Sequence, residues 1–226
     1  MDSVIQNIVE YYNFYFHEQT SPITRDWFLV GKPFQLLSIL AFYFFFCTRL
    51  GPRFMKDRNP YDVTNFMKVY NVAQILLSLY IVYEATTFFL LYNFNVNCQG
   101  LDPDKDIARW VARGVWTYFM AKVSELLDTV LFVLRKSNRQ ITSLHLHHHI
   151  LMTIAAWFGA TYQPGGQAIL IGYLNAFVHT IMYTYYLISG FGDKYKKHLW
   201  WKRHVTELQL VSQLKRLLRK TLYLLL

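Results

Sequence analysis

Charge is scarce in this 226-residue sequence. Asp, Glu, Lys and Arg make up 16% of the residues, whereas apolar residues make up 54% and aromatic residues 18%. An average soluble domain carries roughly 25% charged residues. So low a charge excludes a disordered chain. It also argues against an ordinary soluble domain, because a chain of this length has too small an interior to bury so much apolar surface.

Cysteine is scarce as well, since the chain holds only Cys47 and Cys98. The first lies in an apolar run and the second in a polar segment, so we expect no disulfide between them. Neither is near a histidine in the sequence, which weakens a cysteine nucleophile without excluding it, because catalytic partners can meet in the fold. Internal repeats, low-complexity tracts and strand-like alternation are also absent.

Long apolar runs, by contrast, recur along the chain. A membrane-spanning helix needs about 20 mostly apolar residues. Five segments approach that length: 34–48 (extended back to 27), 69–92, 115–134, 150–162 (extended back through a histidine cluster) and 168–191. A sixth run begins near Val205 and is soon interrupted by basic residues. The sequence predicts an all-α, polytopic membrane helical bundle that forms a single domain over residues 1–226.

The net charge of +9 follows the predicted topology. The loops after the first, third and fifth apolar segments are basic, whereas the loop after the second contains Asp102, Asp104 and Asp106. Basic loops are typically cytosolic, so we expect the amino terminus on the lumenal or outer side. Because the basic residues lie in separate short loops without a recognition motif, we expect no nucleic-acid partner.

The third apolar segment carries charges that a membrane helix should avoid. Lys122, Glu125 and Asp128 (or Thr129) are three to four residues apart and share one helix face. Each charge near the bilayer centre costs about 2.5–3.5 kcal/mol. The stripe therefore indicates a protein-lined or watery cavity, although an internal Lys–Glu pair that only aids packing would give the same spacing.

Histidine is concentrated at the start of the fourth segment. His145, His148 and His149 lie at i, i+3 and i+4, so they share a helix face, while His147 points elsewhere. A lone histidine on an apolar helix is usually a core residue, but three on one face indicate function.

The fifth segment has a polar face of its own, formed by Asn175, His179, Met182, Tyr183 and Tyr186. Tyrosines near a membrane boundary are often interface anchors, but the Asn and His cannot be explained in that way. Three helices with polar faces predict a common interior that serves as a reaction chamber or a transport path.

Two chemistries suit this histidine pattern. A di-iron site needs several histidine clusters and this chain has one, although ligand count permits a single metal held by His145, His148, His149 and His179. Alternatively, a neutral imidazole acts directly as nucleophile or general base near neutral pH. A histidine–acyl adduct hydrolyses readily, so it needs a site that excludes water.

Taken in order, these motifs resemble those of the ELO family, the very-long-chain fatty acid elongases. The matching patterns are K-x-x-E-x-x-D-T (Lys122, Glu125, Asp128, Thr129), H-x-x-H-H (His145, His148, His149) and N-x-x-x-H-x-x-M-Y-x-Y-Y (Asn175, His179, Met182, Tyr183, Tyr185, Tyr186). The resemblance covers about residues 31–209.

The resemblance implies a seven-helix barrel in the endoplasmic reticulum membrane, with a lumenal amino terminus. It also implies a transferase of fatty acid biosynthesis that condenses acyl-CoA with malonyl-CoA to 3-oxoacyl-CoA, releasing CO2 and CoA, without a metal or other cofactor. Its catalytic residues would be His148, His149, His145, His179 and Asp128. Its substrate-binding residues would be Lys122, Glu125, Thr129, Asn175, Met182, Tyr183, Tyr186 and Gln209. Other elongase subunits, or the reductases and dehydratase of fatty acid elongation, would be its partners.

The end of the chain departs from the family pattern. In T-x-x-Q-x-x-Q, Thr206 and Gln209 match but Ser212 replaces the second Gln. Residues 210–226 form an atypical tail without a dilysine signal, so we expect the last helix of the barrel to be missing or incomplete. Two alternatives stay open: an inactive truncated elongase acting as a partner subunit, and a metal-dependent lipid oxidase.

Overall fold

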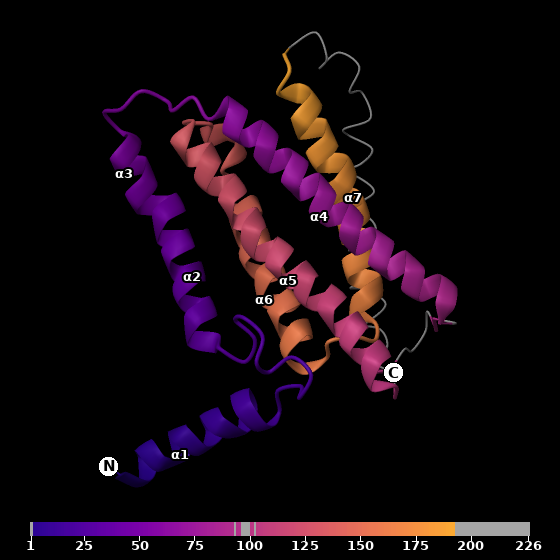
Figure 1. Ribbon diagram of the computed structural model, residues 1–226. Helices are drawn as coiled ribbons and strands as arrows, with labels where there is room; N and C mark the ends of the chain where they lie inside the picture. The colour runs from indigo at the N-terminus through magenta and orange to yellow at the C-terminus, as the bar shows by residue number, and fades with distance from the viewer. Residues whose placement is uncertain (1, 93, 96–99, 102, 193–226) are drawn as a thin grey trace, which may run out of the picture. The chain divides into compact units, whose positions relative to one another are not determined.

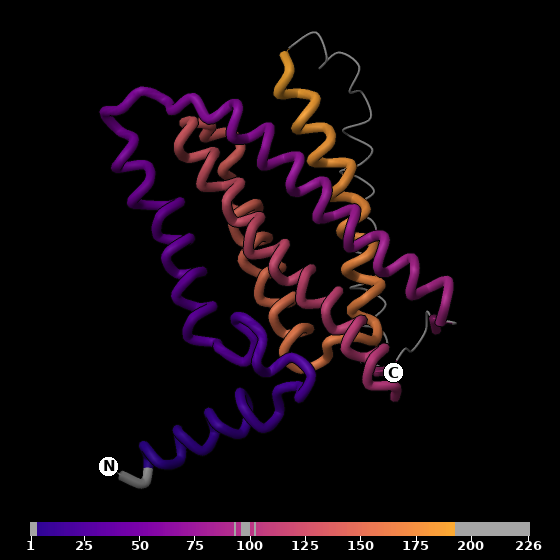
Figure 2. Tube along the Cα trace, viewed as in Figure 1, coloured from indigo at the N-terminus to yellow at the C-terminus, as the bar shows by residue number. Residues whose placement is uncertain are grey.

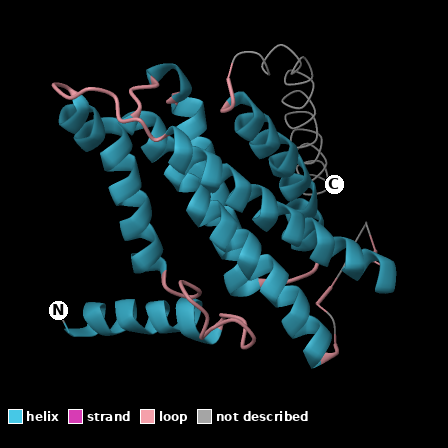
Figure 3. Cartoon of the chain, turned by 45° about the horizontal axis from the view of Figure 1, so that its top comes forward, coloured by secondary structure: helices cyan, strands magenta, loops and turns pink. Residues whose placement is uncertain are grey.

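The computed structural model describes residues 2–92, 94–95, 100–101 and 103–192. All regular structure in these ranges is helical, which confirms the all-α prediction (Figures 1 and 3). The longer helices are α1 (Asp2–Asn13), α2 (Pro33–Phe45), α4 (Thr64–Leu91), α5 (Lys105–Leu134), α6 (Ser143–Tyr162) and α7 (Ala168–Ser189). The short ones are η1 (Phe14–Glu18), η2 (Phe46–Leu50), α3 (Gly51–Met55) and η3 (Asn138–Gln140).

The chain divides into two compact units. Unit 1 comprises residues 1–63 and 84–172, and unit 2 comprises residues 64–83 and 173–226. Each unit is described by itself below. The predicted sixth run, Gln209 and the atypical tail lie outside the described residues, so the seven-helix barrel stays a prediction.

All five predicted apolar segments are helical, and the fifth begins at residue 168 as predicted, but other starts differ from the prediction. The first helix begins at Pro33 and not at residue 27, because proline is suited to the first helical turn and the preceding Leu29 and Gly31 both have a φ of 64°. The third begins at Lys105, ten residues before the apolar run, where the Asp104 side chain accepts hydrogen bonds from two backbone N–H groups. The Thr142 side chain starts α6 in the same way by accepting from the His145 N–H.

Within the described part of the chain, two helices are long and apolar enough to cross a membrane by their own composition. They are Pro33–Met55, in which α2, η2 and α3 follow one another without a break, and Thr64–Leu91. The polar side chains of the candidate site lie instead in α5, α6 and α7.

Unit 1 is built around α5 and α6, which lie side by side (Figures 1 and 2). Small residues, among them the buried Ala112, Ala156 and Ala160, let helices approach closely. The loop between η1 and α2 is tied to the end of α6: the Thr24 hydroxyl donates to the Ala160 carbonyl at 2.7 Å. These contacts fix one end of the α5–α6 pair.

Unit 2 is described for residues 64–83 of α4 and 173–192, most of which belong to α7. The rings of Tyr70 and Tyr183 meet edge-on with centroids 6.1 Å apart. Two residues before Tyr70 in α4, the Lys68 ammonium lies 5.0 Å from the centre of the Phe191 ring. These two contacts hold the described parts of α4 and α7 together within the unit.

Candidate active site

The charged stripe of α5 is buried, as the sequence predicts. Lys122 is 2% exposed and Glu125 3% exposed, and Asp128 and Thr129 are also buried. The Lys122 ammonium donates to both carboxylate oxygens of Glu125, at 2.7 and 2.8 Å. The two charges therefore pair with each other within one helix. This geometry fits an ion pair that only aids packing as well as it fits a functional site.

The histidine cluster of α6 also has the predicted arrangement. The ring centroids of His145 and His149 are 4.4 Å apart, and those of His148 and His149 are 5.6 Å apart. His149 is buried, whereas His145 and His148 are half-buried. His147 is exposed, and its Nδ1 lies 2.7 Å from the carbonyl oxygen of Ser143 in its own helix.

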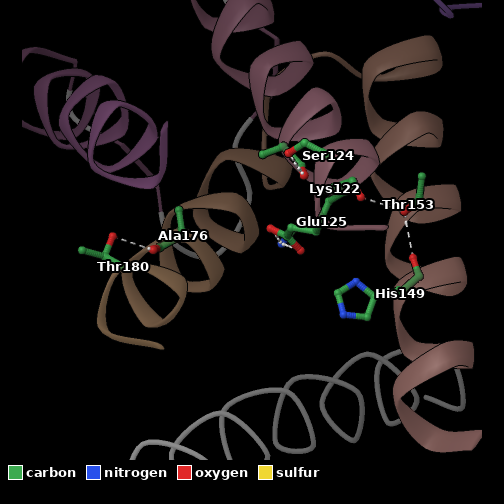
Figure 4. A network of polar contacts seen from close by, with 8 residues as sticks. Lys122, Ser124, Glu125, His149, Thr153, Ala176 and Thr180 are labelled. Carbon is green, nitrogen blue, oxygen red and sulfur yellow. Dashed lines mark hydrogen bonds and ion pairs between the residues drawn. The ribbon is translucent and has the colours of Figure 1, made fainter. Parts of the chain in front are cut away.

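The polar faces of α5 and α6 meet at His149. Its ring extends from α6 toward the Lys122–Glu125 pair (Figure 4). Beneath it, the buried Thr153 hydroxyl lies 2.8 Å from the His149 carbonyl oxygen and 3.3 Å from that of Lys122. Thr153 thus links the backbones that present the histidine and the ion pair, and we refer to Lys122, Glu125, His149 and Thr153 as the α5–α6 polar cluster.

The sequence analysis missed Thr153, which belongs to no motif. A signal was available, because Thr153 lies four residues after His149 and so on the same helix face. Tyr43 was missed too. Its buried hydroxyl lies 2.7 Å from that of Thr129 and connects the first apolar helix to the α5 stripe.

The α7 residues form a second polar cluster, in unit 2. Asn175, His179 and Tyr183 are buried, while Met182 and Tyr186 are half-buried. The His179 and Tyr183 ring centroids are 5.8 Å apart, and those of Tyr183 and Tyr186 are 6.0 Å apart. The face predicted from the sequence is therefore present on α7.

Asn175 stands out because both polar atoms of its buried amide lack a hydrogen-bond partner among the described residues. Burying an unpaired amide costs free energy, so such groups are rare in folded proteins. The α4 part of unit 2 adds three buried polar residues that the sequence analysis did not single out: Asn71, Gln74 and Ser78. Their spacing of three and four residues is a helical stripe inside an apolar run, and that pattern was the available signal.

Two parts of the predicted site are not tested by this geometry. The common interior of α5, α6 and α7 concerns both units and stays a prediction. The second untested part is a metal ion held by His145, His148, His149 and His179. Among the described residues, no three His, Cys, Asp or Glu side chains come together in a way that would hold a metal ion. The need for a cofactor is a matter for experiment.

Comparison with known proteins gives the class of this molecule. The model of the ELO: GNS1/SUR4 family matches residues 28–224. The chain belongs to this family, which consists of polytopic membrane proteins.

Named relatives make the comparison more specific. A very long chain fatty acid elongase of Aedes aegypti is 35% identical over 212 residues, which are 93% of this chain and 59% of the mosquito protein. Very long chain fatty acid elongase 7 of Drosophila melanogaster is 36% identical over 86% of this chain and 59% of its own length. Very long chain fatty acid elongase 1 of Mus musculus is 38% identical over 87% of this chain and 72% of its own length. The chain thus spans about three fifths of the insect relatives it matches.

Proposed function

We propose that this chain is a very-long-chain 3-oxoacyl-CoA synthase, which condenses a long-chain acyl-CoA with malonyl-CoA. Family membership and the names of the relatives support the reaction class. The observation that carries the proposal is the α5–α6 polar cluster, in which a buried imidazole faces a buried ion pair. Burial of these side chains suits an acyl-imidazole intermediate, which water would hydrolyse.

The proposed reaction has two stages. In the first, a ring nitrogen of His148 attacks the acyl thioester carbon, the C–S bond breaks, and the proton of the other ring nitrogen passes to the leaving CoA thiolate. In the second, malonyl-CoA loses CO2 and its enolate carbon attacks the acyl carbon. The C–N bond then breaks and the imidazole takes up a proton. The products are 3-oxoacyl-CoA, CO2 and CoA.

The histidine geometry supports a division of roles. His148 is half-buried, so it is the more accessible of the two neighbouring rings, and the buried His149 ring extends toward the Lys122–Glu125 pair. We therefore assign the nucleophile to His148 and a proton-handling or orienting role to His149. His145 supports the cluster, and Glu125 and Asp128 hold Lys122 and the histidine tautomers, with a direct base role for Asp128 as the alternative.

The α7 residues are assigned to charge stabilisation in the same reaction. Asn175, Tyr183 and Lys122 are hydrogen-bond donors for the oxyanion or the enolate, and His179 is an alternative proton carrier. The unpaired amide of Asn175 supports this assignment, because a substrate oxygen would supply the missing partner. Thr129, Met182, Tyr186 and Gln209 complete the proposed binding residues. The reaction as proposed requires no metal.

Location and partners follow from the same proposal. We place the chain in the endoplasmic reticulum membrane with its amino terminus in the lumen, so that its basic loops face the cytosol and attract the CoA phosphates. The reductases and dehydratase that process 3-oxoacyl-CoA, and other elongase subunits, are the proposed protein partners.

The test is covalent labelling of the purified chain. Incubation with a saturated long-chain acyl-CoA alone should add one acyl group by intact mass spectrometry. His148→Ala should abolish the adduct, and the matched control His147→Ala should keep it because His147 is exposed and faces away. An adduct that persists in His148→Ala and disappears in His149→Ala would move the nucleophile to His149.

A second measurement tests turnover. Radiolabelled malonyl-CoA added to the acylated protein should yield labelled 3-oxoacyl-CoA. A folded chain that neither acquires the acyl group nor incorporates malonyl carbon would overturn the proposed activity and support the inactive-partner alternative.

A further inference from the structure

Helix α1 is the least covered helix in the described part of unit 1. Every side chain described in it is exposed except that of Tyr12, which is half-buried. Ile8, in the middle of the helix, is 62% exposed. Figure 2 shows no other helix of the described part of unit 1 running alongside it. The sequence analysis assigned no role to this segment.

The exposed side chains are sorted by chemistry. At 100° per residue, Val4, Ile5, Ile8 and Val9 fall on one side of the helix, and Tyr12 extends that face by a further turn. The opposite side carries Gln6, Asn7, Glu10 and Asn13. The helix is therefore amphipathic, and the apolar side chains of its first two turns are exposed.

Such a helix needs a partner to be stable. Isolated helices shorter than about 12–15 residues are marginal in water, because the nucleation cost is not recovered without packing of an apolar face. This helix has 12 residues and runs on into the 5 residues of η1. A surface that accepts Val4, Ile5, Ile8 and Val9 would supply the missing stabilisation.

The position of α1 indicates which surface that is. The Tyr12 ring stacks on the ring of Phe34, with centroids 5.5 Å apart, and Phe34 is in the first turn of the apolar helix Pro33–Met55. Phe34 is itself largely exposed, as is Leu37 one turn further on. The apolar surface of α1 is thus continuous with that of a helix suited to cross the bilayer.

Aromatic residues are frequent in the sequence between the end of α1 and the start of α2, among them Tyr11, Tyr12, Tyr15, Trp27 and Phe28. Tyrosine and tryptophan are enriched at the headgroup level of membranes. Residues 2–18 contain no Lys or Arg and include Glu10 and Glu18. Attraction to anionic lipids is therefore not the source of binding, and the apolar face must provide it.

We propose that α1 lies flat in the membrane interface, with Ile5, Ile8 and Val9 in the lipid and Glu10 toward water. A helix of this kind inserts its apolar face about 5–10 Å into the boundary between headgroups and acyl chains. The helix anchors the chain ahead of the first membrane-crossing segment. This inference rests on the membrane setting of the family and not on the proposed condensation reaction.

The test uses the full chain reconstituted in phosphatidylcholine vesicles. Single spin labels are placed at Ile8→Cys and Gln6→Cys after Cys47 and Cys98 are replaced by alanine. Collision rates with oxygen, which partitions into lipid, and with a water-soluble nickel chelate are then compared by power saturation. We expect the oxygen-to-nickel ratio to be several-fold higher at position 8 than at position 6.

A substitution on each face sharpens the test. With a label at Ile5→Cys, Ile8→Glu should lower the oxygen-to-nickel ratio, because a charge on the apolar face expels the helix from lipid. The matched change Gln6→Glu on the polar face should leave the ratio unchanged. Equal nickel accessibility at positions 6 and 8 in the unsubstituted helix would overturn the proposal by placing α1 in water.

A different partner would give a different signature. Low collision rates with both reagents at position 8, together with spin–spin broadening, would show that a second copy of the chain covers the face, and would also overturn the proposal. If the cysteine-free chain does not fold, a photoreactive benzoylphenylalanine at position 8 of the otherwise native chain replaces the label. It should crosslink to phospholipid, and the same group at position 6 should not. Absence of a lipid adduct at position 8 would also overturn the proposal.

Discussion

Removing Lys122 alone should destabilise the protein far more than removing its ion pair as a whole. Both partners are almost completely buried, and the ammonium reaches both carboxylate oxygens within 2.8 Å. Lys122→Met keeps the length of the side chain and leaves the Glu125 carboxylate without its cation. Loss of one partner of a buried pair typically costs about 3–5 kcal/mol, because the remaining charge is uncompensated.

The double variant Lys122→Met/Glu125→Gln removes both charges and keeps both shapes. Its stability should return to within about 1 kcal/mol of the original chain, since replacing a whole buried pair is often neutral. The original chain, Lys122→Met, Glu125→Gln and the double variant are four proteins that form a double-mutant cycle, measured as the free energy of unfolding in one detergent. If Lys122→Met lowers the free energy of unfolding by less than about 1 kcal/mol, a value typical of exposed pairs, the conclusion that the pair is shielded from water is refuted.

The same four proteins separate packing from function. If Lys122 only neutralises Glu125, the double variant should regain condensation activity along with stability. If Lys122 stabilises a developing negative charge, as we propose, the double variant should be stable and inactive. Full activity in the double variant would remove Lys122 from the proposed mechanism and leave it a structural residue.

Three further predictions concern single contacts. Thr153→Val should cost about 1 kcal/mol of stability, the usual value of one hydrogen bond, and lower the rate of acylation, whereas Thr153→Ser should restore both. Asn175→Leu should raise the thermal midpoint, because an unpaired buried amide costs about 1–3 kcal/mol, yet reduce malonyl incorporation; a drop in stability would contradict the unpaired assignment. Gly51→Ala should destabilise by about 1–3 kcal/mol, because its Cβ would lie 2.6 Å from Val133 Cγ1, while the Cβ of the control Gly100→Ala meets no atom of the described residues within 4 Å.

The sequence indicates the polar clusters well because charge is conspicuous in an apolar run. Lys122 and Glu125 share a helix face by spacing alone, and the structure closes them into an ion pair. The histidine spacing likewise separates His149, which faces α5, from His147, which faces out. In both cases helix geometry turns a one-dimensional pattern into a three-dimensional arrangement without tertiary information.

Contacts between segments that are distant in the sequence could not be predicted from it. Thr153 and Tyr43 are ordinary in an apolar run, and only the packing of α6 and of the first apolar helix against α5 brings their hydroxyls to polar partners on α5. The start of that first helix at Pro33 depends on Leu29 and Gly31, whose positive φ values accompany the attachment of this loop to α6. Composition cannot reveal such an attachment, because it depends on a partner more than 100 residues away.

The placement of both charges within one helix bears on how α5 can enter a membrane. A lysine and a glutamate on different helices would each face lipid unpaired until the helices packed. At i and i+3 the two groups neutralise each other as soon as the helix forms, so the cost of about 2.5–3.5 kcal/mol per charge is reduced before α6 is in place. In the folded unit α6 adds the Thr153 link to this pair and extends the His149 ring toward it. Pairing within one helix thus makes a charged stripe compatible with both insertion and polar chemistry.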